Sequence, residues 1–421
     1  MKGDVTQTLN QLKRILFSTL MIHLILLGLF SCQSNPGVLQ RVVQSNDPEI
    51  QAIMKEASKH EVQILLTQIQ RDDAGGLLFE EEQFQLDEQQ YFYPASTAKL
   101  PVAILALQKI KELKSNGVPI TATTPFSITS NEGEVIVATD STQLEGKVTI
   151  NHLIKKIFLV SDNDAYNYLF DFLGRDYINT ELTKKGLSNT QLHHKFLFCA
   201  DNSSTWEYTF FDENQDTLYH QSTLHAQLNL KPHKLKGIKK GTAYLNNGIL
   251  INAPMDFSEK NRISIRDLQE ILKRVLFPDA FPLGERFDLT TEAYSFLRHW
   301  MSRTTLESSS PDYNDGFHWD SYGKFLVYGD KKGAMSPDIR IYNKVGYAYG
   351  TLTDVAYIKD DTSGLEFFLT ATLLVNENGV FNDDKYEFES LGIPFLAALG
   401  RGVLKELNQS YFSNKPNSTK R

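Results

Sequence analysis

The stretch at residues 91–107 constrains the fold of this chain more than any other segment. It begins as an aromatic, strand-like run and continues as an apolar helix, and Ser96 and Lys99 lie where one turns into the other. Because residues three apart share a face of a helix, the Ser96 hydroxyl and the Lys99 amine are expected to lie together. The N-terminus of a helix also favours developing negative charge. The pair therefore has the composition of a nucleophile with its own base, provided that burial keeps the lysine neutral.

The Ser-x-x-Lys spacing by itself is a weak pattern, since surface residues match it by chance. A second copy, Ser321 with Lys324, contains a glycine and has no apolar helix after it, so we interpret it as a loop. The apolar helix that follows Ser96 favours the functional interpretation for the first copy.

The N-terminus is typical of a secreted lipoprotein. Residues 1–31 have a basic start and an apolar run at 15–30 that is shorter than the roughly 20 residues of a membrane span. The run ends at Cys32 in a sequence that resembles a bacterial lipobox, which predicts lipidation of this cysteine; an uncleaved anchor or an ordinary signal peptide is the alternative. Residues 32–46 are expected to form a polar tether.

Composition excludes several classes of function. The formal charge is −8, with basic residues interspersed among acidic ones, so no basic stripe for nucleic acid is present. Only two cysteines occur, Cys32 and Cys199, and lipidation of the first would leave no disulfide framework. The histidines show no metal-ligand spacing, and we expect neither a metal site nor an organic cofactor.

Helical and strand-like periods alternate along the mature chain. A helix at 47–60 is followed by a strand at 61–70 and a return strand within 77–92, and the Ser96 helix ends near residue 113. The segment 130–146 is polar and is expected to form a loop. Further on, the pattern predicts helices at 149–160 and 165–173, a hairpin at 338–357, a strand at 366–375 and a C-terminal helix at 386–407.

A polar tripeptide, Ser161-Asp162-Asn163, separates two of these apolar helices. All three side chains favour turns and local hydrogen bonds, so a helix-capping turn is one interpretation. The other is that Ser161 relays protons near the nucleophile while Asn163 orients an amide substrate.

Ser-x-x-Lys followed by Ser-Asp-Asn 65 positions later resembles the motif set of the penicillin-recognising serine hydrolases. This family includes the class A β-lactamases and the penicillin-binding transpeptidases. Residues 93–102 are similar to the class A nucleophile helix, and residues 159–167 are similar to its second motif. We therefore identify the chain as a divergent, lipoprotein form of a class A β-lactamase or penicillin-binding protein-like hydrolase.

The third motif of the family is Lys-Thr-Gly on a strand beside the nucleophile. Lys-x-Gly occurs four times here, and the hairpin-like surroundings favour Lys344 over the runner-up, Lys239. Val345 replaces the hydroxyl residue of the family motif, which removes a hydrogen-bond donor for a substrate carboxylate. Gly346 and Tyr347 follow and are expected to bind substrate.

Compared with the class A enzymes that it resembles, the chain has extra residues at 188–257 and at 303–337. The first insertion replaces the class A omega loop and is expected to cover the site. Class A enzymes activate the deacylating water with a glutamate in a Glu-x-x-x-Asn pattern in that loop, and no convincing match is found. The available carboxylates are interpreted mainly as solvated loop charges; they are Glu207, Asp212, Glu213, Asp256 and Glu259.

The resemblance implies an α/β (α+β) fold, with an antiparallel sheet flanked by helices and packed against an all-helical domain. The sheet subdomain would comprise 47–95 and 338–408, the helical subdomain 96–337, and residues 409–421 a polar tail. The active site is expected at the junction of the two subdomains.

The resemblance also implies the roles of the site residues. Ser96 would attack the carbonyl, Lys99 would act as base, and Ser161, supported by Lys344, would pass the proton to the leaving nitrogen. Asn163 would bind the substrate amide, and the N–H groups of Ser96 and Tyr347 would form the oxyanion hole.

The expected function is acyl-enzyme hydrolysis of a β-lactam or related amide. The alternatives are a D,D-peptidase or esterase of the penicillin-binding type and a non-catalytic lipoprotein that retains the fold. The expected partners are a small-molecule or peptide amide and, through the lipid, a membrane. The expected state is a monomer in the bacterial periplasm.

Overall fold

The computed structural model of the chain describes residues 36–72, 75–143, 145–197 and 201–414. Residues 1–37 and 38–421 form two separate units, and the description below concerns the second. The predicted signal peptide, the lipidation site Cys32 and Cys199 lie outside the described residues. Among the helices that are described, none combines the length and apolar character needed to span a membrane.

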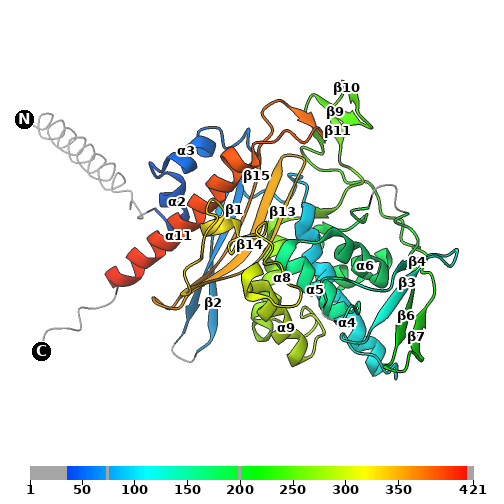
Figure 1. The fold of residues 1–421 in the computed structure, drawn as a ribbon. Coiled ribbons are helices and arrows are strands. Elements are labelled where there is room, and N and C mark those ends of the chain that lie inside the picture. The colour runs from blue at the N-terminus through cyan, green and yellow to red at the C-terminus, as the bar shows by residue number, and fades with distance from the viewer. Residues whose placement is uncertain (1–35, 73–74, 144, 198–200, 415–421) are drawn as a thin grey trace, which may run out of the picture. The chain divides into compact units, whose positions relative to one another are not determined.

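Five antiparallel strands form the central sheet, which joins the two ends of the chain (Figure 1). They are β1 (Gln63–Arg71), β2 (Leu77–Phe84), β13 (Ile339–Ala348), β14 (Thr351–Asp360) and β15 (Leu365–Leu374), in the order β13-β14-β15-β1-β2. The register pairs Leu66 with Leu369 and Lys344 with Val355. This antiparallel sheet with flanking helices confirms the predicted fold class, and β13, which carries Lys344, forms one edge of the sheet.

The two faces of the sheet enter two different cores, since successive side chains of a strand point to opposite faces. Leu66 packs in the core formed with α2 (Val38–Val43), α3 (Pro48–Met54) and α11 (Ile393–Asn414). Its neighbour Leu65 packs in the core of the middle helices, where α8 (Ile265–Leu276) contacts β1, β14 and β15. The sheet is therefore a layer between two sets of helices.

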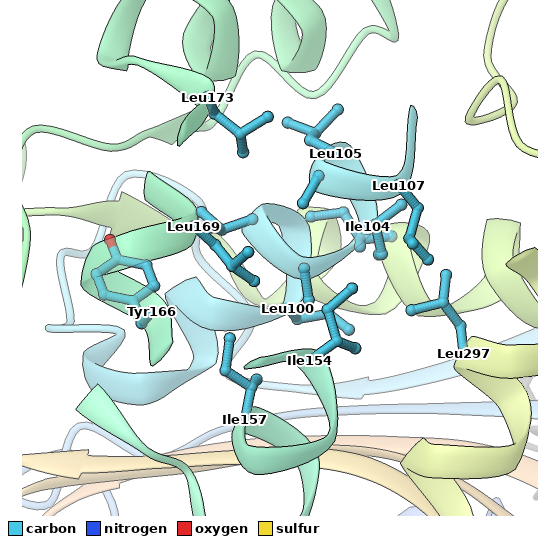
Figure 2. Close-up of a cluster of buried hydrophobic side chains, with 14 of the residues drawn as sticks. Leu100, Ile104, Leu105, Leu107, Ile154, Ile157, Tyr166, Leu169, Leu173 and Leu297 are labelled. Carbon is cyan, nitrogen blue, oxygen red and sulfur yellow. The ribbon is translucent and has the colours of Figure 1, made fainter. Parts of the chain in front are cut away.

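The helix that follows Ser96, α4 (Lys99–Ser115), is the centre of the second core. It is contacted by α5 (Ile150–Val160), α6 (Asn163–Leu173) and α7 (Arg175–Lys184). In Figure 2 the side chains of Leu100, Ile104 and Ile154 meet between these helices. Because α4 is apolar on nearly all sides, it is stable only when surrounded, and this holds its N-terminal turn in place.

The middle segment 96–337, predicted to be all-helical, also contains a four-stranded antiparallel sheet. The prediction is wrong in this detail, because part of the 188–257 insertion alternates buried and exposed residues: Tyr208 and Phe210 pack against Phe126. The 130–146 segment also supplies one short strand. The sheet has the order β4-β3-β6-β7, with β3 (Phe126–Thr129), β4 (Val135–Val137), β6 (Glu207–Phe211) and β7 (Thr217–Gln221).

The other elements are short, apart from one helix. α9 (Thr291–Ser302) contacts β13 and α8. The remaining strands pair in small sheets: β5 (Thr190–Gln191) with β12 (Arg262–Ile263), β8 (Lys239–Lys240) with β11 (Met255–Asp256), and β9 (Ala243–Asn246) with β10 (Ile249–Ile251) and β16 (Val380–Phe381). The remaining helical turns are η1 (Ala95–Ala98), η2 (Pro278–Ala280), η3 (Thr305–Glu307), α10 (Phe325–Tyr328) and a π-helical turn, η4 (Phe388–Gly392).

Two predicted boundaries are wrong. The tether predicted at 32–46 contains α2, whose valine and leucine side chains are buried and which contacts α11. The tail predicted from residue 409 begins later, because α11 continues to Asn414. The tether was predicted because the residues on either side of 38–43 are polar, although Val38 to Val43 itself has an apolar face.

Candidate active site

The turn formed by Pro94 to Thr97, called the nucleophile turn after the role expected of Ser96, follows a buried aromatic run. Ala95, the first residue of η1, has a φ of +46°, which turns the chain sharply at this point. The Thr97 hydroxyl donates a hydrogen bond to the Pro94 carbonyl at 2.6 Å and closes the turn. Such strained positions persist only where the surroundings fix them, and they cluster at active sites. Ser96 is thereby presented at the start of the buried helix α4.

The Lys99 amine lies inside the molecule, next to the second motif. Its Nζ donates to Asn163 Oδ1 at 2.6 Å and to Ser161 Oγ at 3.3 Å, and it also contacts the Ser161 carbonyl. Burial lowers the pKa of Lys99 to about 7, although the charges of Asp162 and Asp164 oppose this shift. A substantial fraction of Lys99 is therefore neutral at neutral pH, as a general base requires.

The Ser96 hydroxyl has no hydrogen-bond partner among the described residues. The sequence predicted that it contacts Lys99, but the amine is occupied by Ser161 and Asn163 instead. Catalytic hydrogen bonds often tighten only when substrate is bound, so this geometry does not exclude Lys99 as the base.

Ser161 joins the two lysines of the site. It ends α5 in the left-handed conformation, with a φ of +57°, which is uncommon for a residue other than glycine. This conformation turns the chain so that Asp162 caps α6, accepting a hydrogen bond from the Ala165 N–H at 2.7 Å. The capping interpretation is therefore confirmed for Asp162, while Ser161 and Asn163 hydrogen-bond the Lys99 amine.

Lys344 reaches the same hydroxyl from the edge strand β13. Its Nζ donates to Ser161 Oγ and to the Val345 carbonyl, both at 2.8 Å. Burial, together with the nearby charge of Lys99, holds the pKa of Lys344 well below its ordinary value. The runner-up, Lys239, lies exposed on β8, with the Asp256 carboxylate 3.9 Å away.

Gly346 brings β13 against the nucleophile turn. A Cβ atom at this position would lie 2.5 Å from the Pro94 carbonyl oxygen and 2.7 Å from the Thr97 amide nitrogen. Only glycine permits this approach, so its role in the structure is to bring the strand close to Ser96. Tyr347 follows on the strand, and its ring is half-exposed between Phe325 and Phe388.

Two hollows meet at Ser96. The larger is a cleft of about 1180 Å³, with Ser96, Asn163 and Tyr347 in its lining. The same three residues also line a smaller hollow of about 470 Å³ with Lys344 and Val345. Residues from the 188–257 insertion line the larger hollow, and residues from the 303–337 insertion line the smaller.

No carboxylate hydrogen-bonds Ser96, Lys99, Ser161 or Lys344 among the described residues. The Phe196 ring, with its centroid 5.4 Å from Lys99 Nζ, lies beside the amine instead. Of the five carboxylates considered in the sequence, only Asp256 and Glu259 line the larger hollow. Lys99, Ser161 and Lys344 therefore form one hydrogen-bonded cluster, and no carboxylate of the described residues hydrogen-bonds to it.

The sequence reasoning missed a buried polar chain behind Lys344. Lys324, dismissed there as part of a loop, donates from Nζ to Asn343 Oδ1 at 2.8 Å and to the Met301 and Ile341 carbonyls. Asn343 Nδ2 in turn donates to Asp354 Oδ1 at 2.9 Å. The detectable signal was Asp354 itself, a carboxylate in the middle of a strand that is buried along nearly its whole length.

Comparisons with known proteins identify the family of the chain. A model of the beta-lactamase enzyme family matches residues 47–373. No curated protein matches the chain. Among solved structures, a beta-lactamase from Xanthomonas campestris is 14% identical with a TM-score of 0.48, covering 87% of this chain and 99% of that one. The L2 structure complexed with relebactam is 13% identical with a TM-score of 0.47, covering 88% and 98%.

Proposed function

Because this chain belongs to the beta-lactamase enzyme family, we propose that it is a serine hydrolase that forms an acyl-enzyme at Ser96 with a β-lactam or a related amide or ester. One observation carries the proposal: the buried amines of Lys99 and Lys344 both hydrogen-bond Ser161 Oγ at the hollow that Ser96 lines. Two desolvated amines at one hydroxyl are costly for stability alone, which favours a chemical role.

In acylation, the Ser96 oxygen forms a bond to the substrate carbonyl carbon as Lys99 takes the hydroxyl proton. Ser161 then gives its proton to the leaving nitrogen or oxygen, whose bond to the carbonyl carbon breaks, and takes the proton held by Lys99 in return. The amides of Ser96 and Tyr347 would stabilise the oxyanion, each contributing roughly 3–4 kcal/mol. The close approach of Gly346 to the nucleophile turn supports this role for its neighbour.

In deacylation, water attacks the ester carbonyl and the bond to Ser96 Oγ breaks. Since no carboxylate of the described residues hydrogen-bonds Lys99 and the Phe196 ring lies beside it, we propose that Lys99 takes the proton of the water and returns it to Ser96 Oγ, and that the step is slow. A long-lived acyl-enzyme would correspond to a penicillin-binding peptidase or esterase, and a short-lived one to a β-lactamase.

The test is intact mass over time after mixing the protein with a penicillin and, separately, with 4-nitrophenyl acetate. Ser96→Ala is the control. A Ser96-dependent acyl adduct from either reagent supports the proposal, and its lifetime distinguishes the two types of enzyme. Absence of any Ser96-dependent adduct from both reagents would overturn it.

We also propose, from the sequence of residues 1–32 alone, that a lipid on Cys32 anchors the enzyme at the periplasmic side of a bacterial membrane. Labelling of cells with a palmitate analogue tests this: the label is expected on the intact protein, and its persistence on Cys32→Ala would refute the assignment.

A further inference from the structure

The charges around the larger hollow are mainly negative. Three carboxylates line it: Asp256, Glu259 and Asp384. Among the described residues, Glu259 and Asp384 have no ion pair, and the partner of Asp256 is distant, at 3.9 Å. A positively charged ligand is therefore electrostatically complementary to this wall.

Two lysines line the same hollow, and one of them is already paired with a carboxylate outside this group. Lys195 is paired with the buried Asp171 at 2.7 Å, and burial lowers the pKa of Lys260. His194, which also lines the hollow, has its pKa lowered to about 4 by burial and is neutral at neutral pH. The three carboxylates therefore outnumber Lys260, the lysine of this lining that has no ion pair among the described residues.

Beside Ser96, the Lys344 amine that would receive a substrate carboxylate is already hydrogen-bonded. Lys344 Nζ is bonded to Ser161 and to the Val345 carbonyl. The Val345 side chain is 5% exposed and packs in the apolar core, so it offers methyl groups where the family motif has a hydroxyl. No arginine, the usual bidentate carboxylate receptor, is in the lining of either hollow within the described part of the chain.

Aromatic rings also line the larger hollow. Tyr347 and Phe388 have ring centroids 5.3 Å apart, and Tyr386 packs on Phe388 at the same distance. All three line the larger hollow. Aromatic faces attract ammonium groups, so these rings favour the same sign of ligand charge as the carboxylates do.

We propose that the substrate is a cationic amide or ester that has no carboxylate beside the scissile bond. Glu259, Asp384 and the Tyr347 ring receive its positive group, and Val345 selects against an anionic one. This inference rests on the proposed acyl-enzyme function and names the substrate class for that site.

Three matched 4-nitrophenyl esters test the inference: those of 4-(trimethylammonio)butyrate, its uncharged isostere 5,5-dimethylhexanoate, and adipate with a free carboxylate. The Ser96-dependent kcat/KM, obtained by subtracting the Ser96→Ala rate, is expected to fall in that order. The cation-to-anion ratio should be at least tenfold at low salt and should shrink as salt screens the charges.

Two sets of variants assign the effect to residues. Glu259→Gln combined with Asp384→Asn is expected to reduce the cation-to-anion ratio several-fold, whereas Glu132→Gln combined with Glu213→Gln, which removes two exposed charges outside both hollows, should leave the ratio unchanged. Val345→Thr is expected to raise the rate with the adipate ester several-fold. Thermal melting of each variant separates loss of fold from loss of selectivity.

The outcomes distinguish two failures. If Ser96 reacts with all three esters and the anionic one is equal or preferred, the inference is overturned and the acyl-enzyme function stands. The inference is likewise overturned if the paired Glu259 and Asp384 variant folds and keeps the wild-type ratio. If no ester or penicillin acylates Ser96, the proposed function itself fails.

Discussion

Gly346 lies against the nucleophile turn so closely that a Cβ atom on it would stand 2.9 Å from the amide nitrogen of Ser96. The atoms around this point belong to the backbone, so they cannot move aside cheaply. Gly346→Ala is expected to displace β13 and to lower the rate of Ser96 acylation at least 100-fold, the loss typical of one oxyanion donor. Single-turnover mass spectrometry measures the rate, and circular dichroism checks the fold.

Gly284→Ala is the matched control for this change. No atom lies within 4 Å of a Cβ at position 284, and its backbone does not have a positive φ. The control should acylate at the wild-type rate. If Gly346→Ala did so as well, the strand would not need its close contact with Ser96.

The pH dependence of acylation follows from Lys99. Its pKa is lowered to about 7 by burial, and only the neutral amine accepts the Ser96 proton. The acylation rate is expected to rise with pH through about 7 and then to level off. Lys99→Arg, which stays charged at all these values, should abolish the reaction. Rates measured from pH 5 to 9 provide the check, and a flat profile would exclude Lys99 as the base.

The same buried amine makes stability depend on pH. Between pH 7 and 10.5 the unfolded chain binds a proton at Lys99 that the folded chain releases, so the free energy of unfolding from this group rises with pH. Its contribution between pH 7 and 9 is about 2 kcal/mol. Urea denaturation of wild type and Lys99→Met at both pH values should show a smaller increase for the variant. An identical increase in both would contradict the burial-driven shift.

Much of the fold around the site could be predicted because local signals there agree with the tertiary structure. Thr149 caps α5 by accepting from the His152 N–H at 3.1 Å, and α5 ends at Val160 as its apolar period indicated. The hairpin that carries Lys344 follows from its alternating pattern. Ser161 directly follows α5 and precedes α6, so the predicted ends of these two helices already fixed its approximate position.

The remainder depends on contacts that no local pattern contains. Lys324 is buried only because the Met301 and Ile341 carbonyls and Asn343 surround its amine, and these come from two other elements. Phe196 lies beside Lys99 because the insertion folds back onto α6, where its ring stacks on Tyr166 at 4.5 Å. A sequence shows that such residues exist, but long-range packing decides their partners.

The Asp354 carboxylate influences the site from behind the edge strand. It is fully buried, accepts from Asn343 and from the Leu326 N–H, and its charge raises the pKa of Lys344 against the effects of burial, Lys99 and Lys324. Asp354→Asn is expected to lower the pKa of Lys344 further. The titration of Lys344, followed by NMR of its side-chain carbon in protein with isotope-labelled lysines, should then move to lower pH, whereas a purely structural loss would leave that titration where it is.

Asp360→Asn serves as the control for Asp354. Asp360 lies at the far end of the same strand, where it accepts hydrogen bonds from Thr362 and Ser363. Its removal should leave the midpoint of the Lys344 titration in place. An unshifted midpoint in a folded Asp354→Asn variant would contradict the electrostatic role.

The buried ion pair between Lys195 and Asp171 fixes the wall of the larger hollow. Both side chains are almost fully buried, and the Trp206 N–H also donates to the carboxylate. Asp171→Asn would leave the Lys195 charge buried without its counter-charge, which costs about 3–5 kcal/mol. Urea denaturation should show this loss, and a Lys195→Met, Asp171→Leu double variant should recover much of it because it removes both charges.

The exposed Lys184→Met change, which breaks a surface pair with Glu181, should leave the midpoint unchanged. An equally small effect of Asp171→Asn would mean that water or a neighbouring group already compensates Lys195, and that this wall does not depend on the pair.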